Sequence, residues 1–167
     1  KERRLRVHKL PAALAFARAN RIDRVVLASA RQRLGIVCQG QAYKDVIEAF
    51  SAMGLSQAEA ASLGVAIYKV GMPWPLEPTG LRAFAAGLET LMVIEHKRPL
   101  IETQARSALY DLPAHARPRV IGKTDETGAP LLSELTSLSV AEIALAIADR
   151  LPPGPHMERV YDYLNRV

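Results

Sequence analysis

The sequence predicts an α/β protein with an open, mostly parallel sheet of about five strands and helices on both faces. Short apolar runs, such as VAIYKV at residues 65–70 and LMVIE at 91–95, alternate with segments whose apolar residues recur at helical spacing. Strands that are apolar throughout are typical of a sheet covered on both sides. In such sheets ligands and partners meet the carboxyl ends of the strands. The loops after residues 70 and 95 are therefore the candidate site.

The strands expected from this pattern follow one another along the chain. They lie at residues 24–28, 34–38, 65–70, 91–95 and 120–121. Pro11 can occupy the first turn of a helix that runs to about Asn20, because its missing N–H costs little there. The chain is then expected to turn at Gly40 into a helix over 43–53, which Gly54 ends.

Capping signals place the other helices. Ser56 with Glu59, and Ser139 with Glu142, have the spacing of a capping box, in which side chain and backbone cap each other reciprocally. Helices that begin at Pro78 and Pro99 complete the strand and helix units. The Asp125–Gly128 stretch (DETG) reads as a turn, and a helix after Ser139 is expected to stop at Pro152-Pro153.

Length and composition indicate one compact α/β unit with short flanking segments. The 167 residues are 49% hydrophobic and 23% charged, which is enough to build a core. We expect a basic N-terminal helix and strand over residues 1–33 and the main domain over 34–151. A linker with an amphipathic C-terminal helix is expected over 152–167, because the proline pair resembles a domain boundary.

Charge and cysteine content argue against several classes of protein. Residues 1–33 hold ten Lys or Arg and two acidic residues, whereas residues 34–167 hold twelve and fifteen, so the body itself is not basic. We therefore expect no nucleic-acid partner. No apolar run approaches the roughly 18 residues of a membrane span, and no signal peptide is evident, so no membrane partner and a cytoplasmic location are expected. Cys38 is the single cysteine and is expected to be buried and inert.

Motifs for catalysis or cofactor binding are not found. The four histidines are scattered and do not have metal-ligand spacing. The glycines between Gly35 and Gly40 lack a dinucleotide fingerprint and a phosphate loop, and no nucleophile elbow occurs. We therefore expect no catalytic, cofactor-binding or metal residue within this chain.

The two loops at the carboxyl edge carry the candidate contact residues. In the first loop, three prolines restrict the backbone around Trp74, so this aromatic side chain is presented at little entropy cost. The second loop, EHKR, could bind an anion or move a proton, but an ion-paired strand end is the simpler interpretation. The expected interface residues are Met72, Trp74, Glu77, Glu95, Lys97 and Arg98.

Four stretches of the chain resemble a known family. The strings GIVCQGQAYKDVIEAFSAMGL, LGVAIYKVGMPWPLEPTGL, GLETLMVIEHKRPLIETQ and PRVIGKTDETGAPLLSEL resemble the middle region of indolepyruvate ferredoxin oxidoreductases, within the 2-oxoacid ferredoxin oxidoreductase family. The resemblance covers roughly residues 10–151, and its most specific parts are the YKVGM-WPLEP loop and the VIE-KR strand end. His96 stands where such proteins often carry a second acidic residue.

The resemblance implies an enzyme that decarboxylates aryl pyruvates with thiamine diphosphate and magnesium. Electrons would pass through iron–sulfur clusters to ferredoxin, and the acyl group would pass to coenzyme A. The matching region resembles a transketolase C-terminal-type domain that packs beside the thiamine-binding modules without being the catalytic centre. This chain is therefore expected to be an inactive, structural or interface domain of a larger polypeptide, whose partners are the other domains.

Two other functions remain open from the residues alone. A free-standing, flavodoxin-like domain that binds a small molecule or nucleotide would share the strand and helix pattern, although Gly40-Gln41-Ala42 makes a poor phosphate-binding turn. A nucleic-acid adaptor would depend only on the basic segment 1–33. Calorimetry with nucleotides and salt-dependent binding of DNA distinguish these alternatives.

Overall fold

The structure, a computed structural model, describes all residues from Lys1 to Val167. Its five strands are β1 (Arg24–Leu27), β2 (Leu34–Gln39), β3 (Val65–Val70), β4 (Thr90–Ile94) and β5 (Arg119–Ile121). They form one sheet in the order β1-β3-β2-β4-β5. Strands β3, β2, β4 and β5 are parallel, and β1 pairs antiparallel with β3 with an irregular register between Val25 and Leu27. The predicted fold class, an open and mostly parallel five-stranded sheet, is confirmed.

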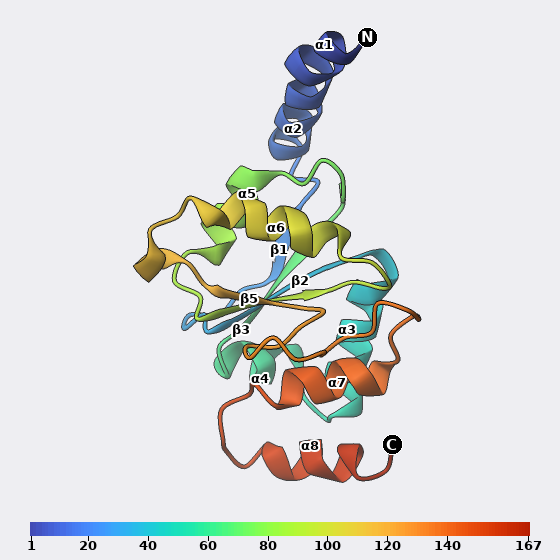
Figure 1. Cartoon of the computed structure of the whole chain (residues 1–167). Helices are drawn as coiled ribbons and strands as arrows, with labels where there is room; N and C mark the ends of the chain where they lie inside the picture. The colour runs from blue at the N-terminus through green and yellow to red at the C-terminus, as the bar shows by residue number, and fades with distance from the viewer.

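Helices cover both faces of this sheet (Figure 1). One face carries α5 (Pro78–Ala85) and α6 (Leu100–Tyr110), and the other carries α3 (Gly40–Ala52), α4 (Gln57–Ser62), α7 (Val140–Ala148) and α8 (Met157–Leu164). The central strands are buried throughout because successive side chains enter opposite layers. In β2, Ile36 and Cys38 join the larger core with α3 and α7, whereas Val37 joins the smaller core with α5 and α6.

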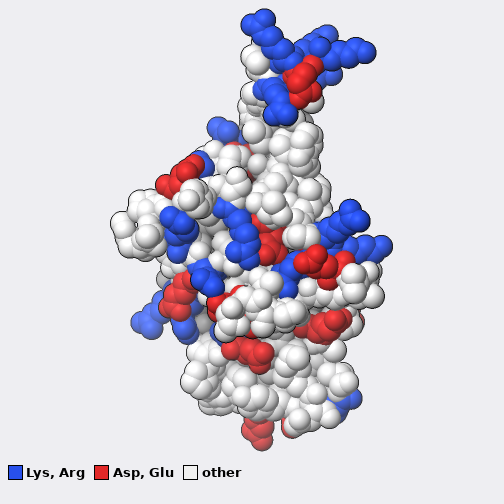
Figure 2. Space-filling view, in the orientation of Figure 1, with Lys and Arg blue, Asp and Glu red and all other residues white.

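The N-terminal segment is a helical arm that points away from the body (Figure 1). It consists of α1 (Glu2–Arg4), a π-helical stretch (Leu5–Lys9) and α2 (Leu10–Ala19). Pro11 lies in the first turn of α2, as expected, but helical backbone also precedes α2 in the π-helical stretch and α1. The π turn before it is wider than an α turn, in which the ring of a proline would clash with the carbonyl four residues earlier. Figure 2 shows Lys and Arg side chains gathered at the far tip of the arm.

Most helix boundaries follow the local signals. Both capping boxes are formed, with Ser56 and Glu59 at α4 and Ser139 and Glu142 at α7. Helix α3 begins at Gly40, three residues earlier than expected. A short 3-10 turn (Ala114–Ala116) precedes β5. No helix is both long enough and apolar enough to cross a lipid bilayer.

The flanking segments contact the central unit. Val160 of α8 is fully buried in the larger core, and Ala17 of α2 is buried at the base of the arm. Arg18, also on α2, pairs with Glu77 of the body at 3.1 Å. The division of the chain at residues 33 and 151 stays a prediction.

Candidate functional site

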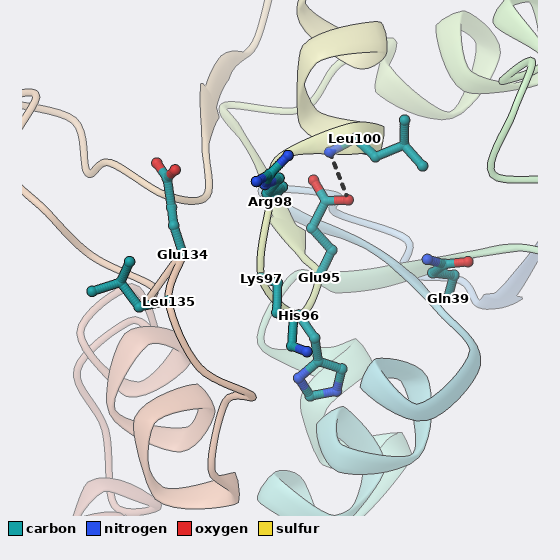
Figure 3. A pocket seen from close by; sticks show the side chains of 8 residues that line it. All are labelled: Gln39, Glu95, His96, Lys97, Arg98, Leu100, Glu134 and Leu135. Atoms are coloured by element: carbon teal, nitrogen blue, oxygen red, sulfur yellow. Dashed lines mark hydrogen bonds between the residues drawn. The ribbon is translucent and has the colours of Figure 1, made fainter.

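The candidate site lies at the carboxyl edge of the sheet, where β2 and β4 end side by side. From β2 the chain continues to β3 on one side, whereas β4 and β5 lie on the other, so this is a point where strand order reverses. Such points commonly form ligand crevices. An open depression of about 570 Å³ occurs here (Figure 3). It is lined by Gln39, Glu95, His96, Lys97, Arg98, Leu100, Glu134 and Leu135.

Glu95 is a buried cap of helix α6. The residue is only 2% exposed, and its side chain points toward the first turn of α6 (Figure 3). The carboxylate accepts hydrogen bonds from the backbone N–H groups of Leu100 at 3.1 Å, Ile101 at 2.8 Å and Glu102 at 2.9 Å. A negative charge is favourable at this end of a helix. The Glu95 carboxylate therefore bonds to the protein backbone and not to groups in the depression.

His96 connects three segments of the protein. Its Nδ1 accepts the backbone N–H of Leu138 at 3.0 Å, so Nδ1 is the unprotonated nitrogen and the proton of the neutral ring is on Nε2. Nε2 lies 3.0 Å from Oδ2 of Asp45, an ion-pair distance without the direction of a hydrogen bond. The other carboxylate oxygen of Asp45 accepts from Gln41 at 2.7 Å. Both nitrogens of His96 thus face protein groups.

Lys97 and Arg98 are the exposed cations of this loop. Neither side chain forms a salt bridge or a hydrogen bond within the chain, although six arginines pair with carboxylates elsewhere. Lys97 has φ of 58°, in the left-handed region that non-glycine residues adopt at a cost. The turn therefore directs two cations outward from a fixed, mildly strained backbone.

Lys123 is a buried residue that joins the two walls of the depression. Its Nζ donates to the carbonyl oxygens of Glu95 at 2.6 Å and Ser133 at 3.1 Å, which ties the β4–α6 loop to the opposite wall. Burial lowers the pKa of Lys123, and the nearby carboxylates of Glu95, Glu102 and Glu134 oppose this shift only in part. The sequence analysis did not identify Lys123, since nothing local separates it from a surface lysine.

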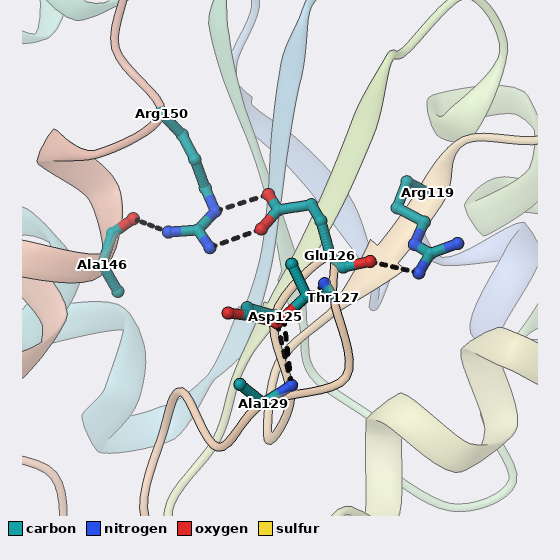
Figure 4. A network of polar contacts seen from close by, with 7 residues as sticks. All are labelled: Arg119, Asp125, Glu126, Thr127, Ala129, Ala146 and Arg150. Carbon is teal, nitrogen blue, oxygen red and sulfur yellow. Dashed lines mark hydrogen bonds and ion pairs between the residues drawn. The ribbon is translucent and has the colours of Figure 1, made fainter.

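The opposite wall is continuous with a braced loop after β5 (Figure 4). Arg150 forms two bonds to the carboxylate of Glu126, at 2.8 and 2.7 Å, and donates a third to the carbonyl of Ala146 at 2.7 Å. Arg119 donates to the backbone carbonyl of Glu126. The hydrogen bonds from Arg150 lower the pKa of Glu126. The expected turn at Asp125 is present: its Oδ1 accepts hydrogen bonds from the backbone N–H and the hydroxyl of Thr127 and from the N–H of Ala129.

The loop after β3 is held at its start by Asp23. Oδ1 of this residue accepts the N–H groups of Gly71 at 2.8 Å and Met72 at 3.0 Å. Gly71 passes so close to the preceding segment that an added Cβ would lie 2.6 Å from the carbonyl oxygen of Ile22. Met72 is half-buried in this stretch. The loop therefore leaves the sheet along one defined path.

Gln104 of α6 holds the middle of the same loop. Its Oε1 accepts the N–H of Leu76 at 2.9 Å, while its Nε2 donates to the carbonyls of Pro73 at 2.8 Å and Leu100 at 2.9 Å. Trp74 lies between these two fixed points and is 57% exposed. Its indole ring is therefore presented to solvent on a clamped backbone.

Glu77 ends the loop as a second buried cap. The residue is 2% exposed and accepts from the N–H groups of Thr79 at 3.1 Å and Gly80 at 2.6 Å, and from Arg18 at 3.1 Å. Burial alone would raise the pKa of Glu77, but these hydrogen bonds outweigh it and the pKa is lowered. Of the six expected interface residues, Trp74, Lys97 and Arg98 are exposed, Met72 is partly so, and Glu77 and Glu95 support the loops from inside.

Groups that could hold a metal do not converge in this structure. No three side chains among His, Cys, Asp and Glu are placed to coordinate one ion. Cys38 is buried in the larger core, and burial raises the pKa of its thiol to about 12.

The amino-acid sequence was compared with models of known protein families. The family model described as the indolepyruvate oxidoreductase domain matches residues 24–167. The chain belongs to this family. The chain is also similar to the indolepyruvate oxidoreductase subunit IorA of Thermococcus kodakarensis, which is 30% identical over 137 residues, 74% of this chain and 20% of the relative. The subunit IorA of Methanothermobacter thermautotrophicus is 29% identical over 161 residues, 93% of this chain and 23% of the relative.

The indolepyruvate oxidoreductase domain thus spans about a fifth of the length of these curated relatives. The resemblance that the sequence motifs had indicated is confirmed. Among solved structures, 2-oxoglutarate:ferredoxin oxidoreductase from Magnetococcus marinus aligns with a TM-score of 0.48 and 17% identity, over 92% of this chain and 23% of that one. An inactive split-gene transketolase aligns with a TM-score of 0.46 and 15% identity, over 86% and 41%.

Proposed function

We propose that this chain is a non-catalytic interface domain of a cytoplasmic indolepyruvate ferredoxin oxidoreductase. The complete enzyme would oxidise aryl pyruvates to acyl-coenzyme A with thiamine diphosphate, magnesium and iron–sulfur clusters, and would pass electrons to ferredoxin. Membership of the indolepyruvate oxidoreductase family supports the assignment to such an enzyme. The residues of this chain do not fit an iron–sulfur cluster or a metal site, because Cys38 is single and buried and no three metal-ligating side chains converge. Other parts of the polypeptide would hold them.

The observation that carries the non-catalytic role is the internal use of the titratable groups at the carboxyl edge. Glu95 accepts three backbone hydrogen bonds, and the two nitrogens of His96 face Leu138 and Asp45. A general acid or base must reach the substrate proton with a free atom. These two side chains, the natural candidates in the depression, serve the fold instead.

The exposed side chains at the same edge are suited to contact. Trp74 is an aromatic residue on a fixed loop, and Lys97 and Arg98 extend from a defined turn. Aromatic residues and arginine are enriched in protein interfaces. We expect this edge, including Met72, to face the thiamine-binding modules.

An activity assay tests the catalytic part of this proposal. The 167-residue chain is incubated with an aryl pyruvate, thiamine diphosphate, magnesium, coenzyme A and an electron acceptor. No turnover above the blank is expected, because the chain offers no site for the cofactors. Turnover by the chain alone would refute the proposal.

A second measurement uses the complete polypeptide that carries this domain. His96→Gln is expected to leave the pH dependence of kcat unchanged, since His96 positions the loop and exchanges no proton with substrate. Loss of one limb of the pH profile would show that His96 is catalytic.

A further inference from the structure

We infer that one exposed surface of the domain docks against an acidic protein surface elsewhere in the same polypeptide, with Trp74 as its aromatic anchor. This carboxyl-edge surface consists of Trp74, Lys97, Arg98, Leu100 and Leu135. The inference rests on the proposed function, and it adds the chemistry of the partner and the residues that recognise it.

The surface carries three large apolar side chains that are exposed to water. Trp74 is 57% exposed, Leu100 is 46% exposed and Leu135 is 89% exposed. Trp74 and Leu100 belong to neighbouring segments, because one Gln104 amide binds both the Pro73 carbonyl and the Leu100 carbonyl. Leu100 and Leu135 line the same depression. Exposed apolar groups gathered in this way mark contact surfaces.

The anchor is already held in place before any partner binds. The side chains of Asp23 and Gln104 fix the two sides of the Trp74 loop through hydrogen bonds to its backbone. Ordering a side chain on a mobile loop would subtract from the binding free energy, and this cost is reduced when the loop is fixed in advance. Fixed aromatic side chains of this kind commonly dominate the energy of an interface.

The charges of the surface indicate an acidic partner. Lys97 and Arg98 have no intramolecular partner, whereas the carboxylates beneath them are engaged: Glu95 caps α6, and Asp45 faces His96. Glu134 is the exposed carboxylate of the depression, and it lies across from the cations on the opposite wall (Figure 3). The cations thus remain free to meet carboxylates on the partner, as electrostatic complementarity requires.

The partner that covers the carboxyl-edge surface is the rest of the same polypeptide. The chain spans only 20% of the relative from Thermococcus kodakarensis, so most of such a polypeptide lies outside it. A second copy of this chain is disfavoured, because a symmetric contact would bring this cationic surface against the same cationic surface.

Hydroxyl-radical footprinting of the complete polypeptide, read by mass spectrometry, tests whether the surface is covered. Trp74 and Leu135 are expected to oxidise several-fold more slowly there than in the 167-residue chain. Tyr161 of α8, which is also 57% exposed, serves as an internal reference for aromatic exposure outside the surface. Equal oxidation of Trp74 in both forms would overturn the inference.

Charge-reversal variants of the complete polypeptide test the chemistry of the partner. Lys97→Glu combined with Arg98→Glu is expected to abolish the protection of Trp74, and high salt is expected to reduce the protection in the unmodified protein. Arg31→Glu, an exposed cation before β2, is the matched control and is expected to leave the protection intact. Protection that survives both the double reversal and high salt would refute an acidic partner.

The stability of the isolated chain separates docking from folding. Trp74→Ala is expected to leave the melting temperature of the 167-residue chain nearly unchanged, while Leu135 loses its protection in the complete polypeptide. A chain that unfolds on this substitution would show Trp74 to be a core residue and would refute the inference. If Trp74 proves exposed in the complete polypeptide, the docking surface is refuted. If the isolated chain is also inactive, the proposed function still stands.

Discussion

Replacing Glu95 by alanine is expected to destabilise the isolated chain strongly, although the residue belongs to a charged loop at the surface of the sheet. The carboxylate is the cap of α6 and accepts three backbone N–H groups at 2.8 to 3.1 Å. Two of its donors, on Ile101 and Glu102, belong to buried residues. Alanine would leave these N–H groups without an acceptor and largely out of reach of water.

The magnitude follows from those two donors. An unsatisfied buried polar group costs about 1–3 kcal/mol, so losing the acceptor of both donors should lower the free energy of unfolding by about 2–6 kcal/mol. Loss of an ordinary, more exposed N-cap costs about 0.5–2 kcal/mol, which is a lower limit here. For a domain of this size, each kcal/mol changes the melting temperature by about 2–4 °C. We therefore expect the melting temperature to fall by roughly 4–24 °C.

Urea denaturation of the 167-residue chain, followed by far-ultraviolet circular dichroism, measures the effect. Glu95→Ala should lower the midpoint without changing the slope. Lys97→Ala in the same loop is the control and should change stability by no more than about 0.5 kcal/mol. Equal effects of the two substitutions would refute the reasoning, because the buried cap would then contribute no more than an exposed cation.

Three further outcomes are expected in the isolated chain. Reversing the charge of Lys97 or Arg98 should change its stability by only about 0–1 kcal/mol, as thermal melting will show; a loss comparable to that of a core residue would contradict their exposed placement. Cys38 should resist alkylation by iodoacetamide at neutral pH until urea unfolds the chain, because burial raises its pKa to about 12; rapid labelling of the native state would argue against this. The hydrogen bond from Arg159, with those from the backbone and side chain of the helix cap, lowers the pKa of Glu59 from 4.5 to about 2. That stabilisation is present above pH 4.5 and is lost as the pH falls toward 2, so the stability difference between the unmodified chain and Arg159→Gln should shrink over this range. A difference that stays constant with pH would exclude the ion pair as its source.

Elements with local signals could be predicted from the sequence. The pairs Ser56 with Glu59 and Ser139 with Glu142 are three residues apart, and each forms the expected capping box. Apolar runs predicted the strand bounds to within a few residues, because strands buried on both faces are apolar along their whole length. The order of the strands, with β1 antiparallel at one edge, depends on contacts between distant segments and has no local signature.

The sequence indicated that both loops follow strands at the carboxyl edge of the sheet, but it did not indicate what contacts their residues make. Glu95 reaches N–H groups five to seven residues further on, beyond the spacing of the known cap motifs. His96 meets Asp45 across 51 positions of chain. Glu77 did carry a usable signal, since it directly precedes Pro78 at the start of a helix and so occupies the N-cap.

The two edges of the sheet bear on how this domain would behave when separated from its enzyme. Strand β1 carries an exposed Arg24 and an irregular register after Val25, and β5 is only three residues long and starts with an exposed Arg119. Edge strands that are short, charged or bulged are poor templates for pairing with another chain. The separated domain thus has built-in resistance to strand-to-strand aggregation and fibril formation, and this resistance does not depend on the partner that covers its carboxyl edge.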